Sequence, residues 1–190
     1  EEACLSGKRT VDFGETTVSP DSYQAALHAA GGACSAVDAV MSGQYLRAFN
    51  CMRPPGHHAR AEQAMGFCLF NNMAIAAHYA EEQYGLERIA IIDWDVHHGN
   101  GTQETFYYSP KILFFSIHQL PLYPHTGEFY DTGARSGQGF TINSPIHKGA
   151  QIEHYLEALN SDLKPALDTF KPGLILISAG FDAHETDPLA

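Results

Sequence analysis

The sequence has few basic residues. Only 11 Lys and Arg side chains stand against 22 Asp and Glu side chains in 190 residues, which gives a formal net charge of -11. A surface of this sign is repelled by the phosphates of nucleic acids and by anionic lipid headgroups. We therefore expect no direct nucleic-acid binding and no membrane partner, and a basic substrate suits the chain better.

Cysteines and long apolar runs are also scarce. No apolar run approaches the ~20 residues that span a bilayer, and the N-terminal stretch EEACLSGKRT lacks the apolar core of a signal peptide. The sequence therefore predicts a soluble, cytoplasmic protein, and it leaves the oligomeric state open. The cysteines are widely spaced, form no CxxC pair and indicate free thiols in a reducing compartment: Cys4, Cys34, Cys51 and Cys68.

The apolar residues follow two patterns, helical spacing and short continuous runs. Continuous runs separated by amphipathic helices predict an α/β fold in which an open parallel sheet carries helices on both faces. We expect one domain over residues 1–190, because no linker or repeat divides the chain. Three helices are predicted. The first begins at Ser19-Pro20, the second begins at Asn71 or Asn72 and ends at Gly85, and the third begins at Gln151 and is kinked before Pro165. A helical turn is expected at 102–106, and strands are expected at 48–51, 89–93, 112–116 and 174–178.

Each predicted strand ends in a cluster of polar residues. In open α/β sheets, ligands bind beyond the carboxyl ends of the strands, where the loops converge. These clusters therefore predict the place of a functional site. They read RPPGHH at 53–58, DWDVHHGNG at 93–101, SIHQ at 116–119 and SAGFDAH at 178–184.

The cluster after residue 92 has the spacing of a metal site. If the chain stays extended, Asp95 and His97 project to the same side and can share one cation, while Asp93 lies a layer deeper. Asp182 arrives from another strand and can supply a third ligand. Two carboxylates and one imidazole suit a catalytic zinc site with open coordination positions. Taken singly, Asp95 and His97 are also compatible with ordinary turn hydrogen bonds.

The pair His57-His58 has two readings. In a Pro-Pro-Gly loop it can be a solvated turn, and opposite a metal-bound water it can act as general base and general acid. Each imidazole then needs a partner that fixes its orientation, and Asp93 and Asn100 are available for this.

The five motifs RPPGHH, GFCLFNN (66–72), DWDVHHGNG, SIH and SAGFDAH occur in this order along the chain. In this respect the sequence resembles the catalytic core of zinc-dependent histone deacetylases, of the class II type and its bacterial amidohydrolase relatives, which include acetylpolyamine amidohydrolases. The resemblance implies the arginase-like open α/β fold of that family, here incomplete at both ends. Its substrates would be acetylated lysine peptides or acetylated small amines such as polyamines.

The resemblance also assigns catalytic roles. It makes Asp95, His97 and Asp182 the ligands of one zinc ion. It makes His58 the general base, while His57 pairs with Asp93 and supports protonation of the leaving amine. Asn100 stands where class I relatives have Asp, which implies a less basic His58.

A substrate slot and a second cation follow from the same resemblance. Phe67 and Tyr123 match the aromatic walls of the acyl-lysine slot, and the Gly66 carbonyl matches the acceptor of the substrate amide. Glu15 lies near the position of a residue that grips the substrate backbone, with Asp12 as the other candidate. The backbone of Asp93, Asp95 and His97, with Ser116 and Ile117, matches the structural potassium site of that family.

The family's oxyanion-stabilising Tyr lies well beyond the last zinc ligand, whereas eight residues follow Asp182 here. We therefore expect this chain alone to be weakly active or inactive. Two alternatives to a deacetylase stay open. The chain can be a catalytically silent metal-binding fragment or interaction module, or, less in keeping with the motifs, a binuclear arginase-type hydrolase.

Overall fold

A computed structural model describes residues 1–12 and 14–189 of the chain. The chain forms two compact units, an N-terminal unit of residues 1–85 and a C-terminal unit of residues 86–190. In the described part of the chain no helix is both long enough and apolar enough to cross a membrane.

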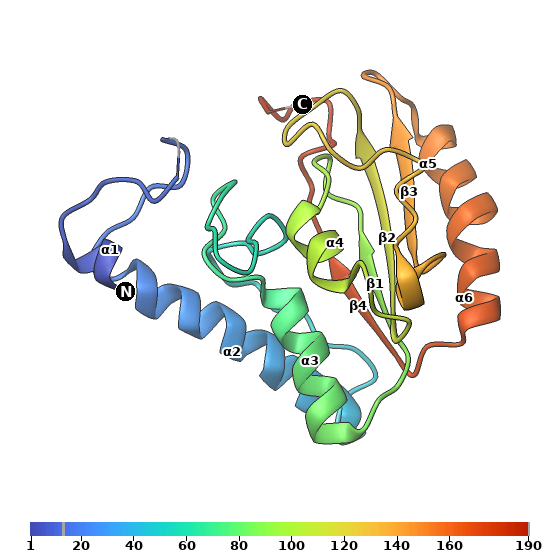
Figure 1. Cartoon of the computed structure of the whole chain (residues 1–190), viewed down its shortest axis with the longest axis horizontal. Helices are drawn as coiled ribbons and strands as arrows, with labels where there is room; N and C mark the ends of the chain where they lie inside the picture. Colours follow the sequence, from blue (N-terminus) through green and yellow to red (C-terminus); the bar gives the residue numbers. More distant parts are fainter. Residues whose placement is uncertain (13, 190) are drawn as a thin grey trace. The chain divides into compact units, whose positions relative to one another are not determined.

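The N-terminal unit is helical (Figure 1). Its helices are α1 (Glu2–Leu5), α2 (Ser22–Met41) and α3 (Asn72–Tyr84). Helices α2 and α3 pack through small side chains, because both bury mostly alanines on their contact faces. Asp38 links the two helices, since its carboxylate accepts hydrogen bonds from the hydroxyls of Tyr79 (2.9 Å) and Tyr84 (2.7 Å).

The ends of α3 confirm the sequence prediction. The Asn71 side chain accepts a hydrogen bond from the backbone N–H of Ala74 (3.0 Å), which satisfies a donor that the first helical turn leaves unpaired. Gly85 ends the helix with φ of 63°, a left-handed conformation that glycine adopts without steric cost. By contrast, α2 begins at Ser22, later than predicted, because Asp21 and not Ser19 occupies the N-cap position.

The strand predicted at residues 48–51 is wrong. The segment is irregular, and the described residues of the N-terminal unit form no strand with which it can pair. It is held to α2 by a side chain instead: Asn50 Nδ2 donates to the Ala29 carbonyl (3.1 Å). A Cβ on Gly32 would lie 2.8 Å from Asn50 Oδ1, so a glycine in the middle of α2 makes room for this contact.

The C-terminal unit contains a four-stranded parallel sheet of order β3-β2-β1-β4 (Figure 1). Three strands were predicted: β1 (Ile89–Asp93), β4 (Leu174–Ser178) and β2 (Ile112–Gln119), which runs three residues further than expected. The central strands β1 and β2 are buried along their whole length, as continuous apolar runs predict. Strand β3 (Thr141–Ile146) is not among the predicted strands, because its polar residues and Pro145 interrupt the apolar pattern of a buried strand. Proline is tolerated there because β3 is an edge strand.

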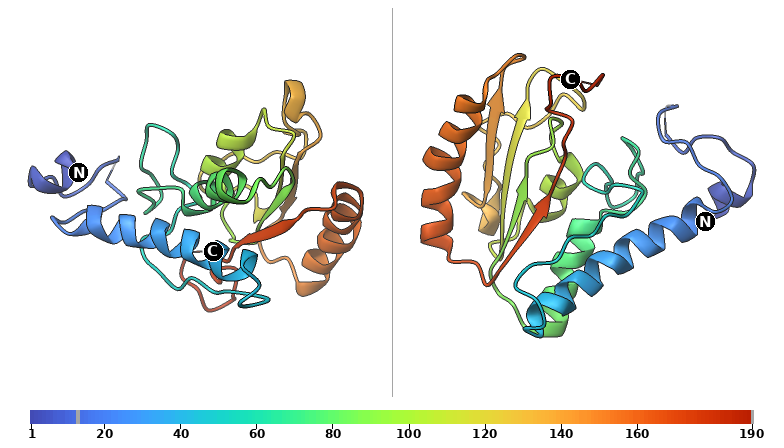
Figure 2. Two further views of the ribbon diagram at one scale, coloured as in Figure 1. Left: turned by 90° about the horizontal axis from the view of Figure 1, so that it is seen from below. Right: turned by 180° about the vertical axis from the view of Figure 1, so that it is seen from behind.

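Helices lie on both faces of this sheet, as the sequence predicted. Phe115 and Ile117 project to one face, where they pack against α5 (Ile152–Ala158), the following π-helical turn (Leu159–Leu163) and α6 (Lys164–Phe170). The alternate residues of β2 project to the other face, on the side of α4 (Asn100–Phe106). Figure 2 shows α5 and α6 running along one face of the sheet.

The predicted kink before Pro165 takes the form of the π-helical turn. Pro165 lies in the first turn of α6, where its missing N–H removes a hydrogen bond to the preceding turn. A wider turn just before a proline relieves the steric conflict with the upstream carbonyl. The α5–α6 rod therefore stays continuous along the sheet.

Candidate metal centre

Two neighbouring strands bring the candidate ligands together. Strands β1 and β4 are paired in parallel, with Asp93 level with Ser178. The pairing continues past the strand ends, since the Trp94 N–H donates to the Ser178 carbonyl (3.2 Å). Segments that follow two adjacent parallel strands leave the sheet at the same edge, so residues 95–97 and residue 182 meet although they are far apart in sequence.

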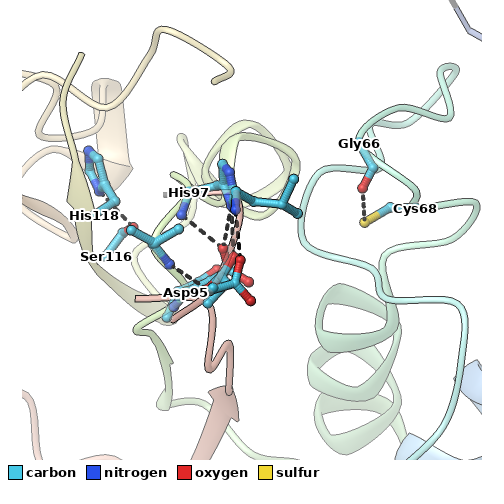
Figure 3. Close-up of polar contacts among 11 residues, drawn as sticks. Gly66, Cys68, Asp95, His97, Ser116 and His118 are labelled. Atoms are coloured by element: carbon cyan, nitrogen blue, oxygen red, sulfur yellow. Dashed lines mark hydrogen bonds and ion pairs between the residues drawn. The ribbon is translucent and has the colours of Figure 1, made fainter. Parts of the chain in front are cut away.

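The three predicted zinc ligands form one cluster in the C-terminal unit. Each of Asp95, His97 and Asp182 offers one ligand atom, and these atoms lie within 4.8 Å of one another. The Nδ1 atom of His97 lies 3.0 Å from Asp95 Oδ1 and 2.9 Å from Asp182 Oδ2. Figure 3 shows the His97 imidazole directed at the carboxylates. All three side chains are half-buried, so the cluster is held by the fold and still reaches solvent.

Backbone hydrogen bonds fix the two carboxylates. The N–H of Val96 donates to Asp182 Oδ1 (3.0 Å), and the N–H of His97 donates to Asp95 Oδ1 (2.8 Å). Gly180, which follows β4, packs directly against Asp95, since a Cβ at that position would lie 2.3 Å from Asp95 Oδ2. The carboxylate orientations therefore come from the loops themselves.

The cluster has the electrostatics of a cation site. Hydrogen bonds that His97 donates to the Asp182 and Asp95 carboxylates raise the pKa of His97 to about 9, against the opposing effect of burial. A proton on His97 thus occupies the place between two carboxylates that a cation can take. Two carboxylates and a neutral imidazole offset the charge of a divalent ion and leave coordination positions open, so the residues present fit a zinc ion.

Further predicted residues surround this cluster in the C-terminal unit. The Tyr123 ring lies beside His97, with ring centroids 6.3 Å apart in an edge-to-face arrangement. Asp93 is fully buried at the end of β1, and its Oδ1 accepts a hydrogen bond from the N–H of Asp95 (3.2 Å). Asn100 is the first residue of α4. The deeper position expected for Asp93 is thus the one it occupies.

The residues of the expected potassium site are neighbours across β1 and β2. Asp93 is level with Ser116, both side chains are buried, and Ile117 follows in β2. The Ser116 hydroxyl lies 2.9 Å from His118 Nδ1 (Figure 3). These positions are compatible with a cation ligand set, and the presence of potassium stays a prediction.

A buried pair of histidines beside this site was not predicted. The rings of His98 and His118 lie against each other in a tilted arrangement, with centroids 4.7 Å apart and an interplanar angle of 47°. His98 contacts Thr126 Oγ1 (2.8 Å) and Gln103 Oε1 (3.0 Å), and His118 Nε2 lies 2.9 Å from the Gly127 carbonyl. The motif SIH contains His118, but nothing local in the sequence indicates that residues 126–127 return to it.

The other predicted site residues belong to the N-terminal unit. His57 and His58 are buried, and their rings lie 3.9 Å apart at an interplanar angle of 42°. Gly66 packs on His58, since a Cβ on Gly66 would lie 2.3 Å from His58 Cδ2. Phe67 is 54% exposed, and Glu15 is exposed. The solvated-turn reading of the histidine pair is therefore disfavoured by burial.

The family model described as "Histone deacetylase domain" matches residues 1–190. A "Probable deacetylase" of Archaeoglobus fulgidus is 46% identical over 179 residues, which cover 94% of this chain and 49% of that protein. "Polyamine deacetylase HDAC10" of Rattus norvegicus is 46% identical over 179 residues, covering 89% of this chain and 30% of that protein.

The structural comparison agrees. The solved structure titled "Crystal Structure of HDA15 HD domain" superposes with a TM-score of 0.89 at 39% identity, and covers 93% of this chain and 51% of that one. The chain spans about half the length, or less, of the relatives it matches. A match over all 190 residues and identities well above 30% show that the chain belongs to the histone deacetylase family.

Proposed function

We propose that this chain supplies the metal core of a zinc-dependent deacetylase that removes acetyl or related acyl groups from lysine side chains or from small amines such as polyamines. The observation that carries the proposal is the convergence of Asp95, His97 and Asp182 on one point. The family to which the chain belongs is zinc-dependent, and the donor set fits that ion.

A zinc ion held by these three side chains would supply a Lewis acid that polarises the acyl carbonyl and makes water a better nucleophile near neutral pH. The chain's own residues move the protons. His58 takes a proton from the attacking water at a ring nitrogen, and His57 gives a proton to the leaving amine. Asp93 and Asn100 keep the orienting roles that the motif resemblance implies.

The proposed substrate is an acylated amine on a methylene chain. An aromatic slot buries such a chain without needing polar partners. Tyr123, which lies beside His97, and the exposed Phe67 are the proposed walls. The Gly66 carbonyl is the proposed acceptor of the substrate amide, and Glu15 is the proposed contact with the substrate backbone or with a second amine.

Two further parts of the proposal concern a second cation and the location of the protein. A potassium ion bound near Asp93, Ser116 and Ile117 would be structural. A cytoplasmic location is proposed from the spacing of the four cysteines, which are free thiols in the structure.

Two observations distinguish a deacetylase from a binuclear arginase-type hydrolase and from a catalytically silent metal-binding module. In the described residues one group of three or more metal-ligating side chains is found, which favours a mononuclear site over an arginase-type binuclear site. A catalytically silent metal-binding module would need the metal ligands but no general acid or general base. The burial of His57 and His58 as a close, tilted pair of rings favours a catalytic role over that reading.

Replacement of His58 tests the proposal. In the full-length protein we expect His58→Ala to keep the zinc content and to lower turnover of an acetyl-lysine peptide by roughly 100-fold or more, the scale of a lost general base. His28→Ala, which removes an exposed histidine of α2, is the matched control and should change neither quantity. A parallel assay with an N-acetylated polyamine separates the two substrate classes. Loss of zinc with His58→Ala would show that this residue is a ligand, and unchanged turnover would refute its role.

A further inference from the structure

The proposed slot wall Phe67 lies in a tight turn of unusual conformation. Met65 and Cys68 exchange two backbone hydrogen bonds, with N···O distances of 3.1 Å and 2.9 Å. Between them, Gly66 has φ of 55° and Phe67 has φ of 66°. Two central residues with positive φ are typical of the type I′ turn, whose favoured sequences are Asn-Gly or Gly-Gly. A phenylalanine in this conformation is strained by its Cβ, so other contacts must hold it there.

One such contact comes from a residue about fifty positions earlier in the chain. The backbone N–H of Phe67 donates to the hydroxyl of Thr16, with an N···O distance of 3.0 Å. Thr16 is 2% exposed, so water does not compete easily for this bond. The turn's own hydrogen bonds use the backbone N–H groups of Met65 and Cys68 and leave the Phe67 N–H to Thr16. The Thr16 hydroxyl is therefore the acceptor that pairs the central amide of the strained turn.

The Thr16 hydroxyl is itself oriented by Asp12. Its hydrogen is donated to Asp12 Oδ2, while Asp12 Oδ1 accepts the backbone N–H groups of Glu15 and Thr16, each at 2.8 Å. An ionised carboxylate is an acceptor only, so the hydroxyl hydrogen points to Asp12 and its lone pairs point away. Burial raises the pKa of Asp12, but its hydrogen bonds to Thr16, Glu15 and Gly14 outweigh burial and bring the pKa below the usual value. Asp12 is thus ionised at neutral pH.

The turn held in this way contacts two parts of the proposed site. Its Gly66 packs on the ring of His58, where no Cβ would fit. Its Phe67 side chain lines a cavity of about 480 Å³ together with Glu15 and Arg53. A shift of the turn would move the aromatic wall and the surface against which the proposed general base packs.

We infer that Thr16 is a positioning residue for Phe67: with its hydroxyl oriented by Asp12, it holds the 65–68 turn in its left-handed conformation and so sets the shape of the acyl slot. This inference rests on the proposed function for the role of Phe67, and on contacts within residues 1–85 for the clamp itself. The hydrogen-bonded set Asp12, Thr16 and the Phe67 amide is called the Thr16 clamp below.

The Thr16 clamp is tested in the full-length protein with three variants. Thr16→Val keeps the side-chain shape and removes the acceptor, and Thr16→Ser restores it. Thr10→Val is the matched control, because among the described residues the Thr10 side chain makes no hydrogen bond. The first readout is hydrogen exchange of the Phe67 amide, which does not depend on activity. The second is kcat and KM for an acetyl-lysine peptide, with zinc content measured in parallel.

We expect Thr16→Val to speed exchange of the Phe67 amide by at least about tenfold, since the amide loses its acceptor. KM should rise about tenfold while kcat changes less than about threefold, since the loss affects binding in the slot more than the chemical step. Thr16→Ser should restore both values, and zinc content should stay constant.

Unchanged exchange in Thr16→Val would overturn the clamp. Faster exchange with KM and kcat both unaltered would overturn its role in the slot. If exchange rises as expected but no variant, nor the wild type, hydrolyses an acetyl amide, the proposed function fails while the clamp stands. The two failures are therefore distinguishable.

Discussion

At the scale of single residues, Gly180 limits where the first ligand carboxylate can lie. A Cβ at this position would lie 2.3 Å from Asp95 Oδ2 and 2.5 Å from Asp95 Cα, distances that no real packing allows. Since both the carboxylate and the backbone of Asp95 are involved, a side-chain rotation alone does not relieve the conflict. The glycine in the motif SAGFDAH thus shapes the candidate metal centre without being one of its proposed ligands.

We predict that Gly180→Ala moves Asp95 and weakens zinc binding by at least about tenfold, with a loss of about 1–3 kcal/mol in the free energy of unfolding from overpacking. Gly31→Ala is the control: a Cβ on Gly31 meets nothing within 4 Å inside α2, so this variant should keep zinc and gain roughly 0.5–1 kcal/mol. Zinc titration and urea unfolding of both variants check this. Equal zinc affinity in Gly180→Ala and wild type would contradict the steric account.

The convergence of the candidate ligand side chains could be predicted from sequence because strand alternation and strand ends are local properties. Asp95 and His97 are two residues apart after an apolar run, which is sufficient to place them on one side. The roles of Gly180, Gly127 and Thr16 could not be predicted in this way. Each depends on a contact with a residue distant in sequence, and no periodicity of the chain encodes such a contact.

At the scale of secondary structure elements, β2 and the loop that follows it are joined by buried histidines. His118, on β2, is fully buried between the Ser116 hydroxyl and the Gly127 carbonyl. Burial lowers the pKa of His118 to about 4, despite the opposing effect of its hydrogen bonds to the backbone of Gly127 and Ser116. The neutral imidazole is therefore the form that the fold accommodates.

This pKa predicts acid sensitivity. The folded-state pKa lies below the unfolded value of 6.5, so the stabilisation is fully present above pH 6.5 and is lost as the pH falls toward about 4. Between about pH 7.5 and about pH 5, we expect His118 to account for about 2 kcal/mol of lost stability. Urea unfolding of wild type and His118→Asn at both pH values measures the difference, and His28→Asn serves as the exposed control. An identical pH dependence in His118→Asn and wild type would contradict the assignment.

Elements whose signals are local were predicted well. The Asn71 cap, the Gly85 end of α3 and the apolar strands β1 and β4 each depend on a few consecutive residues. The failures have a common cause. Strand β3 exists because β2 offers it a partner, and the segment 48–51 stays irregular because the described part of its unit offers none. Strand formation depends on tertiary pairing more than on composition.

At the scale of the whole chain, the net charge of -11 bears on the choice between the two proposed substrate classes. A negative field raises the local concentration of cations and speeds their association, and salt screens this effect over about 8 Å at physiological ionic strength. Acetylated polyamines keep positive charges after acetylation, whereas a neutral blocked acetyl-lysine does not. The two substrates should therefore differ in their dependence on salt.

We predict that raising ionic strength from about 0.01 M to about 0.15 M lowers kcat/KM several-fold for an N-acetylated polyamine and changes it little for a blocked neutral acetyl-lysine. Steady-state kinetics of the full-length protein at both salt concentrations check this. An equal effect on the two substrates would show that long-range charge does not guide binding.

The central claim is that Asp95, His97 and Asp182 hold one zinc ion, and counting the metal tests it most directly. Elemental analysis of the purified protein, after dialysis against zinc-free buffer, should find about one zinc ion per chain in wild type and in the control Glu185→Ala, which removes an exposed carboxylate near the site. In Asp182→Ala and in His97→Ala the content should fall close to zero, because two protein ligands remain in each. Stoichiometric zinc retained in both variants would contradict the account.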